Sequence, residues 1–391
     1  MTQVEIRRID GAELLEVSHL LRDYSFWPSP PLPPLSDSAG ILTGLTDDIH
    51  LALYEDGKAL ACASFTPLNQ HVRSEIVKSG GVWGVATHPA GRRQGYARQL
   101  LLALLDIMKQ EGMAFSSLYP FRESFYDRLG YTNFPHALKV RFPVAVLTRL
   151  LKQDFGGKVE LLPLAEGFAE WRAFLARQQV RLPGMVLFTE TTANVKLKTE
   201  PLWLAIARVN GEVAGMMLYK LKGRSEGMSV SGFYYENSRG LYLLLEWIAR
   251  HADQAEAVEI KLPAGELPET WVPDLYPQVE WYSPPMGRVV DVSRLNGLQS
   301  GPGRFSARII DRQCPWNEGS YTFESVDGLL QVTPTSQAEC ELSIQALTGL
   351  LYGTHRPESF ELRGWGNPDP AVQSTMSGMF PPQLPYMHET F

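Results

Sequence analysis

The stretch that decides the fold is HPAGRRQGYARQLLLALL, His88–Leu105, where two arginines, a glutamine and a glycine directly precede a long apolar run. The preceding residues, GVWGVAT at Gly81–Thr87, read as a strand, and the apolar run reads as a helix. The sequence therefore predicts a strand, a tight turn and a helix. The first backbone N–H groups of such a helix have no intrahelical partners, and with the helix dipole they bind anions such as phosphate.

The turn itself, Arg92–Ala97, has residue types that suit a phosphate group. Gly95 lets the backbone approach a ligand closely, and Ala97 is small for the same reason. Arg92 and Arg93 supply positive charge that suits a diphosphate. The alternative interpretation is an ordinary strand-to-helix connection with solvated arginines.

A repeated order of elements indicates two copies of one mixed α/β unit. The first copy has a hairpin around Asp56–Gly57, followed by the strand, turn and helix described above. The second has a hairpin around Asn210–Gly211, followed by a strand, loop and helix within Gly227–Gln254. Its loop, ENSRGLY at Glu236–Tyr242, lacks the double arginine and the glutamine. Only the first copy is therefore predicted to hold a phosphate.

The chain is long enough for several domains, with 391 residues, 44% of them hydrophobic and 20% charged. A different pattern of strands and one helix begins near Met286, after the proline pair that ends at Pro285. We expect an α/β (α+β) protein with mixed sheets and a smaller α+β domain at its end. The expected domains span residues 1–145, 146–285 and 286–391.

Composition and charge exclude several classes of protein. The net charge of −7 argues against a general nucleic-acid binder, which needs a basic face. No apolar run is long enough to span a membrane, and no signal peptide is expected. The three cysteines, Cys62, Cys314 and Cys340, are too far apart for a disulfide framework or a zinc site. These features predict a cytoplasmic protein without a bound metal.

Two motifs carry a resemblance to a known family. Arg92–Ala97 resembles the acetyl-CoA loop of GCN5-related N-acetyltransferases (GNAT), and FYDRLGY at Phe125–Tyr131 resembles that family's second mark. Two tandem units, the second without its loop, followed by a small domain are similar to the Eis (enhanced intracellular survival) family. In that family the small domain is similar to sterol carrier proteins. Its motif is similar to LTGLLYGTHRP at Leu347–Pro357, and this chain also ends on an aromatic residue, Phe391.

The resemblance implies acetyl transfer from acetyl-CoA to a primary amine, such as an aminoglycoside-like compound, a lysine or a polyamine. It implies that Tyr126 is the general acid, that the terminal carboxylate of Phe391 is the base, and that the protein is a homohexamer. It also implies a set of residues that contact acetyl-CoA: Val85, Ala86, Thr87, Arg92, Arg93, Gln94, Gly95, Tyr96, Ala97, Phe121 and Arg122.

Each implied role has a structural alternative. Tyr126 can simply pack its helix against the sheet, and the chain end can be a frayed tail. Against fraying, LPYMHETF at Leu384–Phe391 is unusually apolar, and His388 and Glu389 are alternative bases. Four aromatic residues can line an amine pocket or belong to the core: Tyr24, Phe26, Trp27 and Trp83. For the whole chain, the alternative is a non-catalytic ligand- or lipid-binding protein that uses the acetyltransferase fold as a scaffold.

Overall fold

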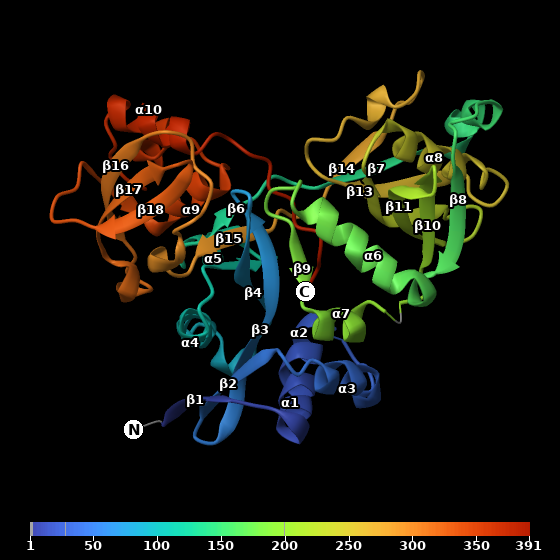
Figure 1. Ribbon diagram of the computed structural model, residues 1–391. Coiled ribbons are helices and arrows are strands. Elements are labelled where there is room, and N and C mark those ends of the chain that lie inside the picture. Colours follow the sequence, from blue (N-terminus) through green and yellow to red (C-terminus); the bar gives the residue numbers. More distant parts are fainter. Residues whose placement is uncertain (1–2, 28, 199) are drawn as a thin grey trace. The chain divides into compact units, whose positions relative to one another are not determined.

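The computed structural model describes residues 3–27, 29–198 and 200–391, and for residues 35–38 and 41 it describes the backbone alone. The chain forms two compact units, each assembled from segments far apart in the sequence (Figure 1). The first unit comprises Met1–Phe134, Pro183–Val195 and Pro285–Phe391, and the second comprises Pro135–Leu182 and Lys196–Pro284.

The first unit contains a mixed sheet of eight strands in the order β1-β2-β3-β4-β5-β15-β6, with β9 pairing to β3. Its hairpin turns at Asp56 and Gly57, which both have positive φ, as the favoured two-residue hairpin turn requires. The predicted hairpin is therefore confirmed. The strands are β1 (Val4–Arg8), β2 (Ile49–Glu55), β3 (Lys58–Val72), β4 (Glu75–Thr87), β5 (Phe115–Leu118), β6 (Thr132–Asn133), β9 (Val186–Phe188) and β15 (Met286–Val289).

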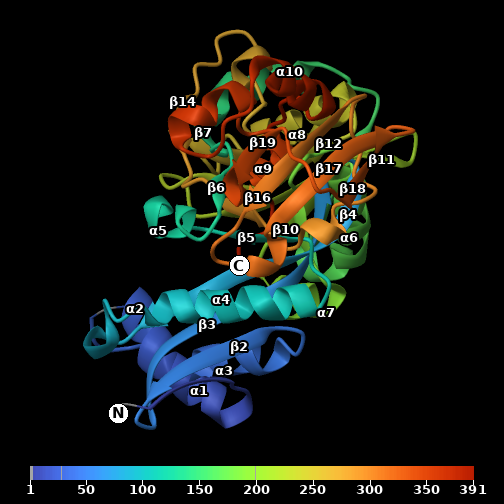
Figure 2. The ribbon, with the colours of Figure 1, turned by 90° about the vertical axis from the view of Figure 1, so that its left-hand side faces the viewer.

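One long helix, α4, crosses this sheet over β2, β3 and β4 (Figure 2). Its buried face carries Leu100, Leu104 and Met108 at helical spacing, because only that face meets the sheet. A Cβ at Gly80 would lie 2.7 Å from Sδ of Met108, so the helix packs directly on the strand backbone. The helices are α1 (Gly11–Ser18), α2 (Tyr24–Phe26), α3 (Leu35–Gly44), α4 (Tyr96–Gln110), α5 (Glu123–Asp127) and α7 (Glu190–Lys196).

The helical stretch formed by α1 and α2 has one irregularity. Between α1 and α2 the chain takes a π-helical turn, His19–Asp23. A π turn fits an extra residue into a helix and is frequently found at functional sites. Hydrophobic periodicity does not distinguish such a turn from a regular one.

The C-terminal part of the first unit has its own sheet, ordered β18-β17-β16-β19. Two capped helices complete it: the Ser343 side chain accepts from the N–H of Ala346, and that of Asp369 accepts from the N–H groups of Ala371 and Val372. The elements are β16 (Arg304–Ile310), β17 (Gly319–Val326), β18 (Leu329–Pro334), β19 (Cys340–Ser343), α9 (Ile344–Tyr352) and α10 (Pro370–Met379).

The second unit is built on a seven-stranded mixed sheet ordered β14-β7-β13-β12-β11-β10-β8. Its hairpin turns at Asn210–Gly211, again with both φ angles positive, as predicted. The elements are β7 (Leu138–Pro143), β8 (Lys158–Pro163), α6 (Leu164–Gln179), β10 (Trp203–Val209), β11 (Glu212–Leu221), β12 (Met228–Tyr235), α8 (Ser238–Ala249), β13 (Ala257–Leu262) and β14 (Gln278–Trp281).

Two strands join a sheet other than that of their neighbours in sequence. β7 follows the first unit's strands in the chain, yet it pairs with β13 and β14 of the second unit. β15 precedes the C-terminal sheet, yet it lies between β5 and β6. The fully buried ion pair of Arg288 with Asp311, at 2.5 Å, ties β15 to the C-terminal part of the same unit. Within the described residues, no helix is both long and apolar enough to cross a membrane.

Candidate active site

The sheet of the first unit opens where β4 and β5 separate. The two strands pair in parallel from Ser79–Phe115 to Val82–Leu118, and there β5 ends while β4 continues to Thr87. Among the described strands, none pairs with β4 on this side beyond Val82. An open strand edge offers backbone groups to an extended ligand, as in β-strand addition. Val85, Ala86 and Thr87 lie in this segment.

A bulge bends β4 at the same point. The register with β3 shifts between Cys62 and Ser64, and Gly84 within the bulge has a φ of +62°. A Cβ at Gly84 would lie 3.0 Å from Cδ of Arg22. Both the left-handed backbone and the close side chain therefore favour glycine here.

The turn Arg92–Ala97 follows this open edge and starts α4. Gly95 is the N-cap residue with a φ of +82°, and no side chain caps the first N–H groups of the helix. A Cβ at Gly95 would have no described atom within 4 Å, so the backbone is accessible. Exposed Arg92, Arg93 and Gln94 surround it. This arrangement suits an anion at the positive end of the helix dipole.

Two residues of the turn are less exposed than the others. Tyr96 is buried and its hydroxyl is hydrogen-bonded to Glu55, so toward a ligand it offers only its backbone N–H. Ala97 is half-buried. Arg92 also donates from Nε to the carbonyl of Thr87 at 3.4 Å, which joins the turn to the end of β4.

Tyr126 lies on α5 and is only 3% exposed. Its ring is surrounded by those of Phe121, Phe125 and Tyr131, with centroids 5.6, 5.0 and 6.1 Å away. This burial raises the pKa of Tyr126 above its usual value. The hydroxyl is therefore protonated at neutral pH, which is the state that a proton donor needs.

The last twelve residues, Phe380–Phe391, form a tail without helix or strand that ends beside β9 (Figure 1). The guanidinium of Arg73, at the β3–β4 turn, donates to the carbonyl of Pro381 at 2.9 Å and to two carbonyls of α9. Further along, the N–H of Tyr386 donates to the carbonyl of Pro183 at 2.8 Å. These contacts hold the tail against the sheet, so it is not frayed.

The tail ends at the separating strands. A Cβ at Gly81 would lie 2.8 Å from Cε2 of the Phe391 ring, so this ring packs on the backbone of β4. The Phe391 ring also meets Tyr119 edge-on, with centroids 5.6 Å apart. Tyr119 is a residue that the sequence pattern did not single out. Its place directly after β5 was visible in the sequence, but its contact with the chain end was not.

Comparison with known proteins identifies two domains in the chain. Residues 5–134 match the model of the acetyltransferase (GNAT) domain family, and residues 297–388 match that of the sterol carrier protein domain. The chain carries a GNAT acetyltransferase domain and a sterol carrier protein domain. No curated protein sequence matches the chain.

Several solved structures share the fold over the full length of the chain. A probable N-acyltransferase from Enterococcus faecalis is 19% identical with a TM-score of 0.88, and both chains are covered completely. A GCN5-related N-acetyltransferase from Anabaena variabilis is 17% identical with a TM-score of 0.87, again with complete coverage of both. Eis1 from Mycobacterium abscessus is 18% identical with a TM-score of 0.77 and the same coverage. The predicted mixed α/β fold is confirmed.

The four aromatic residues of the GNAT domain that were expected around an amine differ in their exposure to solvent. Phe26 and Trp27 are 57% and 54% exposed, and Tyr24 is 38% exposed. Trp83 is half-buried, and its indole N–H donates to Oδ2 of Asp48 at 3.1 Å. The guanidinium of Arg22 lies 4.6 Å from the centre of a Trp83 ring. A cation–π contact therefore already uses one face of Trp83.

Phe121 and Arg122 lie on the surface between β5 and α5. Phe121 is 73% exposed and its ring covers Tyr126 and Phe125. The exposed Arg122 donates from Nε to Oγ of Ser124 at 3.1 Å. Phe121 thus lies between the buried hydroxyphenyl ring of Tyr126 and solvent.

In the second unit, the corresponding places are the start of α8 and the point where β12 and β13 separate, and both are filled. The Asn237 side chain caps α8 by accepting from the N–H of Gly240 at 3.1 Å, so this donor is already used. A Cβ at Gly240 would lie 1.9 Å from the carbonyl oxygen of Ala214, in contrast to the open space at Gly95. Where β12 and β13 separate, Trp271 stacks on Phe233 with ring centroids 5.6 Å apart.

Proposed function

We propose that the protein is an acetyl-CoA-dependent N-acetyltransferase of the Eis family that acetylates a primary amine. One observation carries the proposal: the open edge of β4 leads directly to the uncapped, arginine-flanked start of α4. This arrangement suits the two parts of coenzyme A. The backbone of Val85–Thr87 would hold the extended pantetheine, and Arg92–Ala97 would hold the pyrophosphate.

In the proposed reaction the amine attacks the carbonyl carbon of the thioester. The C–N bond forms, the C–S bond breaks, and the Tyr126 hydroxyl gives its proton to the departing thiolate. The amine proton passes to the carboxylate of Phe391, and proton transfer from there restores Tyr126. The raised pKa of Tyr126 makes it a weaker acid in the free protein. The positive charge that develops on the attacking nitrogen favours the transfer, because it stabilises the phenolate.

The carboxylate of Phe391 cannot simply take a proton from a free ammonium group. A terminal carboxyl has a pKa of ~3.5 and an ammonium of ~10, so the transfer costs roughly 9 kcal/mol. The amine must therefore bind in its neutral form, or lose its proton as its nitrogen becomes more acidic during attack. The half-buried position of Phe391 beside Gly81 supports a role near the reacting atoms. His388 and Glu389 stay alternative bases.

The finer assignments, from the sequence pattern and from the resemblance, are proposals too. We propose GNAT domains at residues 1–145 and 146–285, the second without a pyrophosphate loop, and a sterol-carrier-like domain at 286–391. We also propose a homohexamer in the cytoplasm, with an aminoglycoside-like, lysine or polyamine acceptor near Tyr24, Phe26, Trp27 and Trp83.

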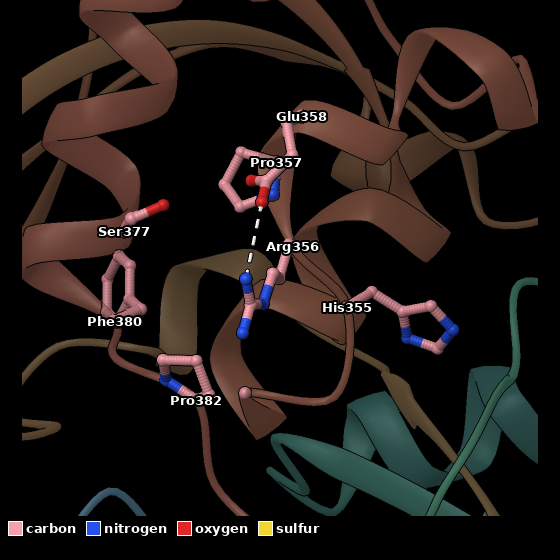
Figure 3. Close-up of a pocket in the computed structure, with 8 residues that line it drawn as sticks. His355, Arg356, Pro357, Glu358, Ser377, Phe380 and Pro382 are labelled. Carbon is pink, nitrogen blue, oxygen red and sulfur yellow. Dashed lines mark ion pairs between the residues drawn. The ribbon is translucent and has the colours of Figure 1, made fainter.

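A ligand-binding role is a second candidate, favoured by a cavity in the sterol carrier protein domain. The cavity has a volume of about 280 Å³ and lies beside the tail (Figure 3). Phe380 and Pro382 form apolar walls, and Arg356 pairs with Glu358 at 3.8 Å. His355 points away from the other labelled side chains in Figure 3. Its ring packs against Trp365, with centroids 5.0 Å apart.

A thiol-release assay with acetyl-CoA and a panel of amines tests the proposed function. The expected result is release of coenzyme A that depends on one class of amine, with the acetylated amine identified by mass spectrometry. Binding of acetyl-CoA without release for any amine in the panel would favour the non-catalytic candidate. Absence of both binding and release would contradict the proposed function.

A further inference from the structure

Tyr119 contacts the end of the chain in two ways. Its hydroxyl donates to the backbone carbonyl of Glu389 at 3.0 Å. Its ring meets that of Phe391 edge-on, at 5.6 Å and an interplanar angle of 61°. The last three residues of the chain are thus held by a hydrogen bond to their backbone and by a ring contact. Burial raises the pKa of Tyr119, so its hydroxyl stays a donor at neutral pH.

The position of Tyr119 in the sheet gives these contacts their importance. Leu118 forms the last parallel pair with β4, opposite Val82, and Tyr119 is the next residue. It therefore projects from the point at which the edge of β4 opens. The other described contacts of the tail with Pro183 and Phe188 involve the β9 segment, away from β5.

The same short segment also touches the proposed acid. Two residues after Tyr119, the ring of Phe121 meets that of Tyr126, with centroids 5.6 Å apart and an interplanar angle of 73°. Tyr119–Phe121 therefore contacts Phe391 with its first residue and Tyr126 with its last. A shift of this segment would change the distance between the two proposed catalytic groups.

We propose that Tyr119 is a positioning residue that holds the terminal carboxylate of Phe391 at the open edge of β4. This rests on the proposed function of that carboxylate as the base. Tyr119 itself takes no proton: it fixes the backbone two residues before the terminus and limits the rotation of the final ring. Loss of its hydroxyl should leave the acetyl-CoA loop untouched, because Arg92–Ala97 follows the far end of the open edge, which runs from Val82 to Thr87.

Tyr119→Phe removes the hydroxyl alone. Semisynthesis can place 4-fluorophenylalanine at position 391, so that ¹⁹F NMR reports on the terminal ring without any need for turnover. In Tyr119→Phe we expect the signal to narrow and move toward that of the free peptide. We also expect kcat to fall by about twofold to tenfold, the range for one neutral hydrogen bond, with unchanged affinity for acetyl-CoA.

Tyr242→Phe is the matched control, because the Tyr242 hydroxyl also donates to a backbone carbonyl, that of Trp271 at 2.9 Å. It should change neither the ¹⁹F signal nor kcat. A ¹⁹F signal that Tyr119→Phe leaves unchanged would overturn the positioning role. A loosened ring with unchanged kcat would uphold the positioning but contradict the role of the carboxylate as base, so the two failures are distinguishable.

A double-mutant cycle gives a further test. If Tyr119 acts through the terminal carboxylate, Tyr119→Phe should cost nothing more in a chain that lacks Phe391. The same fold-loss in both backgrounds would overturn the proposal and assign Tyr119 a general role in stability.

Discussion

The ring of Phe391 occupies space that Gly81 leaves free, because a Cβ at position 81 would lie 2.8 Å from Cε2 of that ring. The final residue of the chain thereby packs on the strand whose continuation forms the open edge. Phe391 lies three residues beyond the range that matches the sterol carrier protein domain, residues 297–388. The end of the chain therefore packs on a strand of the GNAT domain within the first unit.

Gly81→Ala tests this contact. The added methyl group would meet Phe391 and Cδ1 of Leu68, which are both movable side chains, so the tail should shift while the sheet stays folded. A displacement of about 1 Å at a catalytic group can cost ~10²-fold in rate. We expect a loss of kcat approaching that size with acetyl-CoA affinity retained. Gly378→Ala is the control, because a Cβ there meets no described atom within 4 Å. Unchanged kcat in Gly81→Ala would argue against a working position for Phe391.

Gly95→Glu tests the anion site. It would put a negative side chain at the uncapped start of α4 and strain a residue with a φ of +82°. Calorimetry should find one acetyl-CoA site per wild-type chain and none in the variant. Gly211→Glu is the control, because Gly211 has a φ of +86° and equally open surroundings, but lies in the second unit's hairpin. Two sites per wild-type chain would show that the second unit also binds acetyl-CoA.

Tyr126→Phe tests the general acid. Removing the hydroxyl should lower kcat by ~10²–10⁴-fold and leave acetyl-CoA affinity nearly unchanged. Because burial raises the pKa of Tyr126, its deprotonation should not limit the free enzyme below about pH 10, the ordinary value for tyrosine. A pH profile of kcat/KM measures this. A decrease of kcat smaller than about threefold would make Tyr126 structural.

His355 makes stability depend on pH. Burial, with a smaller contribution from Arg363, lowers the pKa of His355 to about 4, from an ordinary value of ~6.5. Between these values the unfolded chain binds the proton more readily, so stability falls as pH decreases from about 6.5 to 4. In His355→Gln this part of the acid sensitivity should disappear, as urea midpoints across that range would show. His136→Gln is the control, because His136 is exposed. Equal pH dependence in His355→Gln and wild type would contradict the assignment.

The sequence predicted those parts of the fold that local chemistry determines. Asp56–Gly57 and Asn210–Gly211 turn as predicted, because few residue pairs adopt two positive φ angles easily. Gly95 likewise indicated the turn before α4. The sequence did not predict that β7 pairs in the second sheet and β15 in the first. Hydrophobic patterns show that a segment is a strand, but they do not identify a distant partner.

The same limit applies to the site. Arg92–Ala97 is one continuous motif, so the sequence predicted it together with the following helix. Tyr119 joins the proposed site through Glu389 and Phe391, which lie far along the chain. The C-terminal sequence indicated only that the tail was too apolar to be fully solvated. The structure shows the path of the tail through single contacts, such as that of Arg73 with Pro381.

The most direct test of the account is the turnover of a chain extended by a few residues beyond Phe391. Extension converts the terminal carboxylate into a peptide carbonyl and moves the new carboxylate away from Gly81. We expect thiol release, measured with the best amine of the panel, to fall strongly while acetyl-CoA still binds, and an N-terminal extension of equal length to have no effect. Full turnover in the C-terminally extended protein would contradict the claim that the end of the chain is part of the active site.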